Sequence, residues 1–122
     1  MLSIDGENTN IEVLHRGETV AENIQNAIGA GPNLVSYDSI TKSSYIDIPA
    51  DDDNVNDLDW AAKSAVGVKF DTATGKATHI MLLTTDGNDG CKYNDISCGL
   101  DMKSVASLLK DKYGAHIALS MD

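Results

Sequence analysis

Residues 79–122 constrain the fold of this chain most, because they predict a complete unit of strand, loop, helix and strand. The run IMLL at 80–83 is continuously apolar, which is typical of a strand covered on both faces. The strand then ends in a polar segment, which consists of Thr84, Thr85, Asp86 and Gly87. Ligands of open sheets flanked by helices tend to bind where such strands end, so this position is the first candidate for a functional site.

The helix of this unit has a clear beginning and a clear end. Asp101 is a good N-cap residue, and Gly114 is placed to end the helix at C′. Between them, one face of the predicted helix is apolar and carries Met102, Val105, Leu108 and Leu109. Residues 115–119 then predict a second strand that returns to the core.

A β-hairpin is predicted directly before this unit. Side chains alternate between two sets along residues 63–70, as they do on the two faces of a strand. The segment DTATGK at 71–76 is a turn sequence, and Gly75 can adopt the positive φ that such a turn uses. Residues 64–71 and 77–85 are therefore expected to pair as antiparallel strands.

The first part of the chain predicts one helix and several short strands. Thr19 and Glu22 form a capping box, and apolar residues at helical spacing follow, so a helix is expected over residues 19–28. The Gly31-Pro32 pair forbids its continuation. Short strands are expected at 11–14, 33–37 and 45–48.

Together these elements predict one domain, residues 1–122, of the α+β or mixed α/β class. The expected fold is a twisted, largely antiparallel sheet of about five strands, with two helices, 19–28 and 101–113, packed on it. A chain of 122 residues buries roughly 65% of its unfolded surface, which is enough for a single hydrophobic core.

The charge of the chain excludes several classes of partner. It has 9 basic and 19 acidic residues, a net charge of −10 and a pI of about 4.4. This balance argues against binding a nucleic acid polymer or an anionic membrane through a basic surface. The sequence has no apolar run long enough for a membrane-spanning helix. Its first residues, MLSIDGEN, lack the basic and apolar regions of a signal peptide.

Five segments follow one another in an order that is typical of a known family. They are AIGAGPNLV at 27–35, KSAVGV at 63–68, the strand ending in Asp86-Gly87, SCGL at 97–100 and IALSMD at 117–122. Through these segments, residues 27–122 resemble the phosphodiester glycosidase family. The resemblance covers the middle of the family domain. Members carry an Asn-Gly-Gly-Phe-Phe-type segment upstream and a glycine-rich, serine-containing segment downstream, and neither is found here.

The resemblance implies a hydrolase that cleaves a glycosyl phosphodiester or a related glycoside. The best-known activity of the family removes N-acetylglucosamine from a sugar 1-phosphodiester. The chain alone is then expected to need the missing segments or a second polypeptide that completes the sheet, with a homo-oligomer as another alternative. The alternative function is a non-catalytic carbohydrate- or nucleotide-binding module on the same scaffold. The expected partner is a sugar phosphodiester or another small anionic glycoside.

Two carboxylates are the candidate catalytic residues. Asp86 follows the apolar strand, and Asp122 matches the aspartate of the family's last motif. Paired carboxylates suit glycosidic cleavage through an oxocarbenium-like transition state. The structural alternative for Asp86-Gly87 is a plain turn. Lys63 takes the position of the family's arginine, where it keeps the charge but lacks the planar fork that binds a phosphate bidentately.

Further residues are expected to contact the substrate through small side chains or the backbone. The N–H groups from Gly99 to Lys103, at the start of the predicted helix, are a candidate anion site, for which Asp101 competes. Gly31 lies in the segment that approaches the sugar in the family, although a simple turn is an equal explanation. The complete set of expected substrate-binding residues is Gly31, Lys63, Ser64, Gly87, Ser97 and Gly99.

Cys91 and Cys98 lie close together on one polar loop. A disulfide between them is the favoured interpretation, and it would pin the loop beside the candidate site of a secreted or extracytoplasmic protein. In a cytoplasmic protein both residues would be free thiols.

No metal site or cofactor is expected. His15, His79 and His116 lack metal-ligand spacing, and a structural role is favoured for His116. A Ca²⁺ site is an alternative, because the acidic segment DDDNVNDLD offers several carboxylates, among them Asp51, Asp52 and Asp53. This segment lacks the glycine and the glutamate of an EF-hand loop, so a solvated surface loop is favoured.

Overall fold

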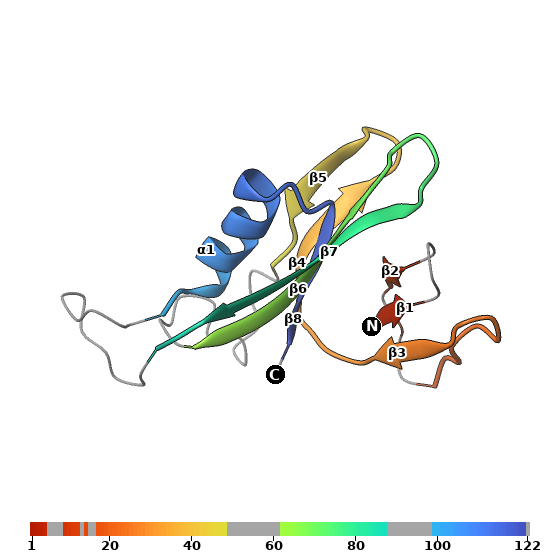
Figure 1. The fold of residues 1–122 in the computed structure, drawn as a ribbon, viewed down its shortest axis with the longest axis horizontal. Coiled ribbons are helices and arrows are strands. Elements are labelled where there is room, and N and C mark those ends of the chain that lie inside the picture. The colour runs from red at the N-terminus through yellow and green to blue at the C-terminus, as the bar shows by residue number, and fades with distance from the viewer. Residues whose placement is uncertain (5–8, 13, 15–16, 49–61, 88–98, 122) are drawn as a thin grey trace.

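The structure is a computed structural model, and it describes residues 1–4, 9–12, 14, 17–48, 62–87 and 99–121 (Figure 1). In chain order, its elements are β1 (Leu2–Ile4), β2 (Asn10–Ile11), β3 (Asn26–Ile28), β4 (Asn33–Asp38), β5 (Ser43–Ile46), β6 (Lys63–Phe70), β7 (Ala77–Thr85), α1 (Met102–Ser107), the π-helical segment η2 (Leu108–Lys112) and β8 (Ile117–Met121).

Five of these strands form one antiparallel sheet in the order β5-β4-β8-β6-β7. The expected antiparallel sheet of five strands is therefore confirmed. The predicted hairpin is confirmed as well, since Lys63 pairs with Thr85 and Lys69 with His79. β8, the last strand of the chain, lies between β4 and β6 in the middle of the sheet.

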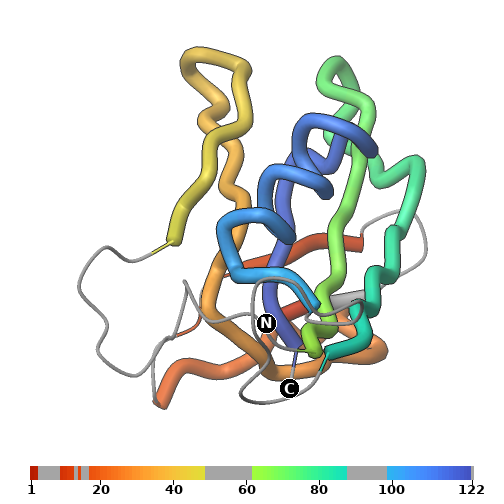
Figure 2. Tube along the Cα trace, turned by 90° about the vertical axis from the view of Figure 1, so that its left-hand side faces the viewer, coloured from red at the N-terminus to blue at the C-terminus, as the bar shows by residue number. Residues whose placement is uncertain are grey.

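The five-stranded sheet is the middle layer of three. α1 lies on one of its faces, and the small sheet β2-β1-β3 lies on the other (Figure 1). Figure 2 shows the same arrangement from the side of the helix, with the N-terminal strands behind the sheet. Because both faces of the central strands are covered, two hydrophobic clusters form, one on each side of the sheet.

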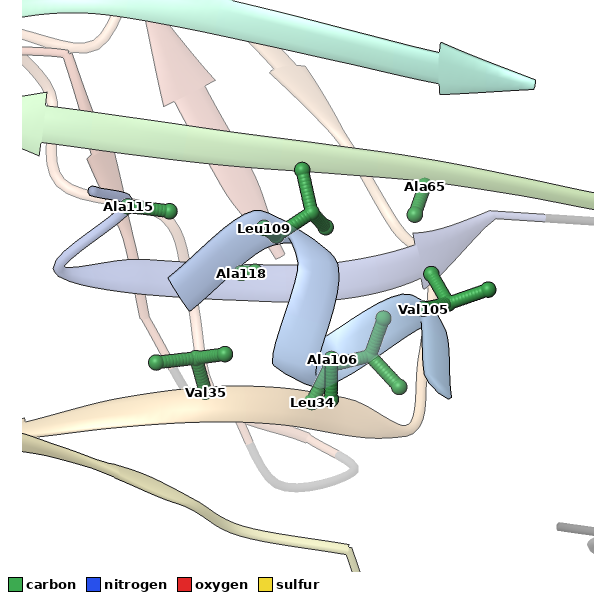
Figure 3. Close-up of a cluster of buried hydrophobic side chains, with 8 residues drawn as sticks. All are labelled: Leu34, Val35, Ala65, Val105, Ala106, Leu109, Ala115 and Ala118. Atoms are coloured by element: carbon green, nitrogen blue, oxygen red, sulfur yellow. The ribbon is translucent and has the colours of Figure 1, made fainter. Parts of the chain in front are cut away.

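The first cluster lies between the helix and the sheet (Figure 3). Its buried members are Leu34, Val35, Ala65, Val105, Ala106, Leu109, Ala115 and Ala118. The second cluster joins Leu2 of the small sheet to Val66, Val68, Ile117 and Leu119. Successive residues of β6 thus alternate between the two clusters, as the pleat of a strand requires.

Gly67 on β6 allows the close approach of the chain that follows the helix. A Cβ atom on this residue would lie 3.1 Å from the Ala115 Cβ atom and 3.5 Å from a methyl group of Leu109. Glycine fits this position because there is no room for a side chain between β6 and the first cluster.

The second predicted helix is confirmed, with the expected ends. The Asp101 carboxylate accepts a hydrogen bond of 2.6 Å from the Ser104 backbone N–H, as an N-cap residue does. The last turns widen into the π-helical segment η2. Gly114 then ends the helix with a φ of 73°, which glycine adopts without steric cost.

The first predicted helix is wrong. Residues 19–28 form turns and the strand β3, which pairs with β1. Val20 and Ile28, both expected on its apolar face, are 41% and 49% exposed. Short helices are stable mainly when an apolar face packs on a core. Here no core surface receives that face, and pairing with β1 satisfies the backbone of residues 26–28 instead.

The expectation that the run at 80–83 is covered on both faces is also wrong. β7 lies at the edge of the sheet, and Ile80 and Leu82 are 46% and 77% exposed. Met81 and Leu83 pack against the first cluster. The alternating exposure along β7 is that of a strand with only one covered face.

The remaining strand boundaries follow the expectations more closely. β4 and β5 correspond to the strands predicted at 33–37 and 45–48, whereas β2 is shorter than the strand predicted at 11–14 and begins one residue earlier. No described helix has the length and apolar character that crossing a membrane requires.

Candidate functional site

Several of the predicted site residues lie at one end of the five-stranded sheet. This end, called the β7 terminus here, is formed by the last residues of β7 and β8 and the first residues of β6 and β4. Ser64 pairs with Thr84 on one side and with Met121 on the other. Residues distant in sequence, from Lys63 to Met121, therefore meet on adjacent strands.

Asp86 and Gly87 follow β7 directly at this end. Asp86 is exposed, and its Oδ1 atom accepts a hydrogen bond of 2.9 Å from the Gly87 backbone N–H. This contact joins neighbouring residues and holds the carboxylate against the backbone.

Lys63 lies on the neighbouring strand, opposite the residue before this carboxylate. It pairs with Thr85, the residue before Asp86, and its backbone N–H donates a hydrogen bond of 2.9 Å to the Thr85 hydroxyl. The residue is half-buried, and within the described part of the chain no ion pair is recorded for its ammonium group. The cation thus lies on β6 at the end of the sheet, and the carboxylate follows the last residue of β7 at the same end.

Gly31 reaches the same end through the segment that leads into β4. The adjacent Pro32 carbonyl accepts a hydrogen bond of 3.0 Å from the Ser120 N–H near the end of β8. Gly31 also lines a pocket of about 290 Å³ together with Glu12, Leu14, Asn33 and Asp47. Neither Glu12 nor Asp47 was among the predicted site residues.

Asp47 is held in place beside this pocket. Its Oδ2 atom accepts a hydrogen bond of 2.6 Å from the Ser36 hydroxyl, and its backbone N–H donates to the Leu34 carbonyl. Asp47 follows β5 and Asp86 follows β7, and these strands are the two edges of the sheet. Four strand spacings of about 4.8 Å put them roughly 19 Å apart, too far for the paired carboxylates of a glycosidase.

At the predicted anion site, at the start of α1, Asp101 competes for the backbone N–H groups as expected. Gly99 has a φ of 80°, and the chain then turns into the helix. The Asp101 carboxylate already accepts the Ser104 N–H, and the Asp101 carbonyl accepts the Val105 N–H. The chain's own carboxylate therefore occupies part of the cradle that a phosphate would need.

His116 has the structural role that the sequence analysis favoured. Its Nδ1 atom accepts a hydrogen bond of 3.1 Å from the Phe70 N–H, and its ring packs against the rings of Phe70 and Tyr37. Burial, and secondarily the charge of Lys69, lowers the pKa of His116. A neutral ring is the form that can accept this hydrogen bond, so the geometry and the pKa agree.

A second hollow, of about 520 Å³, lies away from the β7 terminus. Glu12, Tyr37, Phe70, Thr72 and Gly75 contribute to its lining. Phe70, Thr72 and Gly75 belong to the turn end of the β6–β7 hairpin, so the hollow contains none of the predicted site residues.

Some predictions concern residues outside the described part of the chain. These are Asp122, Ser97, the Cys91–Cys98 disulfide and the acidic segment with Asp51, Asp52 and Asp53. Among the described residues, no group of three or more histidine, cysteine or acidic side chains is arranged to hold a metal ion.

The comparison with known protein families supports the resemblance found in the sequence. The model of the phosphodiester glycosidase family matches residues 3–122. The match begins well before the first of the five segments, so it includes the strands of the small sheet. Neither a curated protein nor a solved structure matches the chain. With nearly its whole length matched by the family model, the chain belongs to the phosphodiester glycosidase family.

Proposed function

We propose that this chain carries catalytic residues of a hydrolase that cleaves a glycosyl phosphodiester. In this reaction water adds across the bond between the anomeric carbon and the phosphate oxygen, which releases a sugar and a phosphate monoester. The observation that carries the proposal is the β6–β7 register, in which Lys63 is opposite Thr85, next to Asp86. Family membership supports the reaction class.

In this proposal Asp86 acts as an acid or base at the glycosidic bond, and Lys63 stabilises the phosphate charge. A positioned carboxylate contributes by transferring a proton in the transition state. A nearby ammonium group stabilises the negative charge on the leaving phosphate. Since lysine is a point charge, we expect it to bind the phosphate less specifically than the arginine that it replaces.

Asp122 is proposed as the second carboxylate. Met121, the residue before it, pairs with Ser64 at the end of β8. β8 and β7 are separated by one strand, so their backbones are roughly 10 Å apart. Asp122 itself lies outside the described residues, so its proposed role rests on the family's last motif.

The test is turnover of a synthetic sugar 1-phosphodiester by the purified chain, followed as release of the free sugar. We expect Asp86→Asn to lower kcat by about 10²- to 10⁴-fold, because the amide cannot exchange a proton. The matched control is Asp38→Asn. Asp38 is half-buried and also accepts local backbone N–H groups, but it ends β4 at the opposite end of the sheet.

Two results would contradict the proposal. One is equal turnover by the wild-type chain and Asp86→Asn. The other is binding of the phosphodiester by a well-folded wild-type chain with no release of sugar, which would favour the non-catalytic binding module.

A further inference from the structure

The second hollow, of about 520 Å³, lies between the small sheet and the five-stranded sheet. Asn10 of β2 lines it from one side, and Tyr37 of β4 and Phe70 of β6 line it from the other. Its volume is in the range of pockets that bind small molecules. Lys63 begins β6 and Phe70 ends it, so seven residue steps, or roughly 23 Å, separate this hollow from the β7 terminus.

Two aromatic rings form a fixed base for this hollow. The rings of Tyr37 and Phe70 meet edge to face, with their centroids 4.9 Å apart. The Phe70 ring also packs on the His116 ring at 4.3 Å between centroids, and the Phe70 N–H donates to His116 Nδ1. His116 is not part of the lining, so it holds the Phe70 ring in place without occupying the hollow. A ligand therefore meets rings whose positions are already set, which lowers the entropic cost of binding.

Three turns each carry one polar side chain to the lining, namely Asn23, Ser39 and Thr72. Each of these turns is closed by a short-range hydrogen bond of its own. The three bonds run from the Ile24 N–H to the Ala21 carbonyl (3.0 Å), from the Ile40 N–H to Asp38 Oδ1 (2.8 Å) and from the Gly75 N–H to the Asp71 carbonyl (2.7 Å). The polar groups of the hollow are thus positioned before a ligand binds.

The lining is polar but almost uncharged. Its neutral hydrogen-bonding side chains, apart from the Tyr37 hydroxyl, are Thr9, Asn10, Asn23, Ser39 and Thr72. Among the described residues, Glu12 is the one carboxylate of this lining, and the lining contains no lysine, arginine or histidine. A phosphate or another anion would find no cation here, and Glu12 would repel it. The hollow therefore favours a ligand without negative charge.

We propose that this hollow binds a neutral carbohydrate, at a site separate from the proposed catalytic residues. Sugar hydroxyls both donate and accept hydrogen bonds, and so do the serine, threonine and asparagine side chains of the lining. The apolar C–H face of a sugar ring packs on the aromatic base. A purely apolar ligand fits less well, because it would displace water from the polar side chains without replacing its hydrogen bonds. The inference is independent of the proposed hydrolysis, since neither Lys63 nor Asp86 lines the hollow.

The first experiment titrates the purified chain with the methyl glycosides of glucose, galactose, mannose and N-acetylglucosamine, and it follows the backbone N–H signals by NMR. We expect at least one of these sugars to shift the signals of Asn23, Thr72 and Gly75 saturably, with a Kd of about 10 mM or tighter. Asp86→Asn should give the same Kd at these three residues. This result would separate the hollow from the proposed hydrolysis, whichever outcome the turnover assay has.

A matched pair of substitutions tests the hydrogen bonds of the lining. Asn23→Ala should raise the Kd about three- to tenfold, because it removes one hydrogen-bonding side chain from the hollow. The control is Asn26→Ala. Asn26 is also exposed and is close in sequence, but it lies in β3 and does not line the hollow. The control should leave the Kd unchanged.

The second experiment tests the charge of the ligand with the same readout. The uronic acid form of the sugar that binds has a carboxylate in place of its CH₂OH group, and it should bind at least about tenfold more weakly. Glu12→Gln should reduce this difference, because it removes the like charge. The variant retains an oxygen acceptor for Asn10 Nδ2, which lies 3.4 Å from Glu12 Oε1.

Several results would overturn the proposal. One is the absence of a saturable shift at Asn23, Thr72 and Gly75 with all four glycosides at up to about 100 mM. Shifts confined to Gly87 would put the sugar at the β7 terminus instead. Equal weakening by Asn23→Ala and Asn26→Ala, or equal affinity for the uronic acid and the neutral sugar, would also contradict it. Binding of tetramethylammonium ion at these residues in place of the sugars would indicate a cation site built from Glu12 and the two rings.

Discussion

β6 and β7 are paired strands of one hairpin, and their environments are opposite. Val66 and Leu82 are direct cross-strand partners, yet Val66 is fully buried and Leu82 is 77% exposed. The more apolar strand in the sequence is thus the less buried one in the fold. This difference shows that the hydrophobicity of a run does not decide its position in a sheet.

The reason is the width of the layers that cover the sheet. α1 and the small sheet cover β8 and β6 on opposite faces, as the two hydrophobic clusters show. On the side of the small sheet, this cover ends before β7. On the helix side, β6 presents the small residues Ala65 and Gly67, which let the first cluster approach closely.

The largest expected effect comes from filling the space at Gly67. Gly67→Val should destabilise the fold by about 3 kcal/mol, because its side chain would overlap Ala115 and force the first cluster apart. Chemical denaturation measures the change. Gly29→Val is the control, since nothing lies within 4 Å of a Cβ atom at Gly29. Equal stabilities of the two variants would contradict the close packing of β6.

A smaller effect separates the two partners of one cross-strand pair. Val66→Ala should cost about 2 kcal/mol of unfolding free energy, because it removes methyl groups from a fully buried site. Leu82→Ala should cost less than about 0.5 kcal/mol. Both are measured by urea denaturation at a protein concentration too low for self-association. A larger loss of unfolding free energy in Leu82→Ala than in Val66→Ala would contradict the difference in burial between β6 and β7.

The helix that covers β6 provides a third comparison. Asp101→Ala should cost about 1 kcal/mol, because the Ser104 N–H loses its acceptor at the helix start. Asp101→Asn retains an acceptor and should cost much less. Thermal unfolding followed by circular dichroism measures both, and equal losses in the two variants would show that the cap contributes nothing.

The smallest effect is a change in pH dependence at the far end of β6. The lowered pKa of His116 means that the unfolded chain binds more protons than the folded chain as pH falls below about 6.5. Stability is therefore present above that pH and is lost as pH falls toward the folded pKa. His116→Asn keeps an acceptor for the Phe70 N–H but does not titrate, so its Tm should fall less between pH 7 and pH 5. The two proteins differ at this position alone, so parallel pH profiles would contradict the role given to His116.

The site shows the same division between local and tertiary information. The end of β7 before Asp86 and the pairing of β7 with β6 follow from the hairpin pattern, and both were predictable. The pocket beside Gly31 was not, because Glu12 and Asp47 are brought to it by strands of different sheets. No short-range sequence pattern indicates that Glu12 and Asp47 lie in the same pocket.

By itself, the sequence determined the local features of this protein. The N-cap at Asp101, the end of the helix at Gly114 and the β6–β7 turn all depend on residues close to one another along the chain. The family follows from the order of five short segments. The tertiary structure decided whether residues 19–28 form a helix and which strand is buried on both faces. Both outcomes depend on which surfaces are available for packing, and that availability is set by contacts between distant segments.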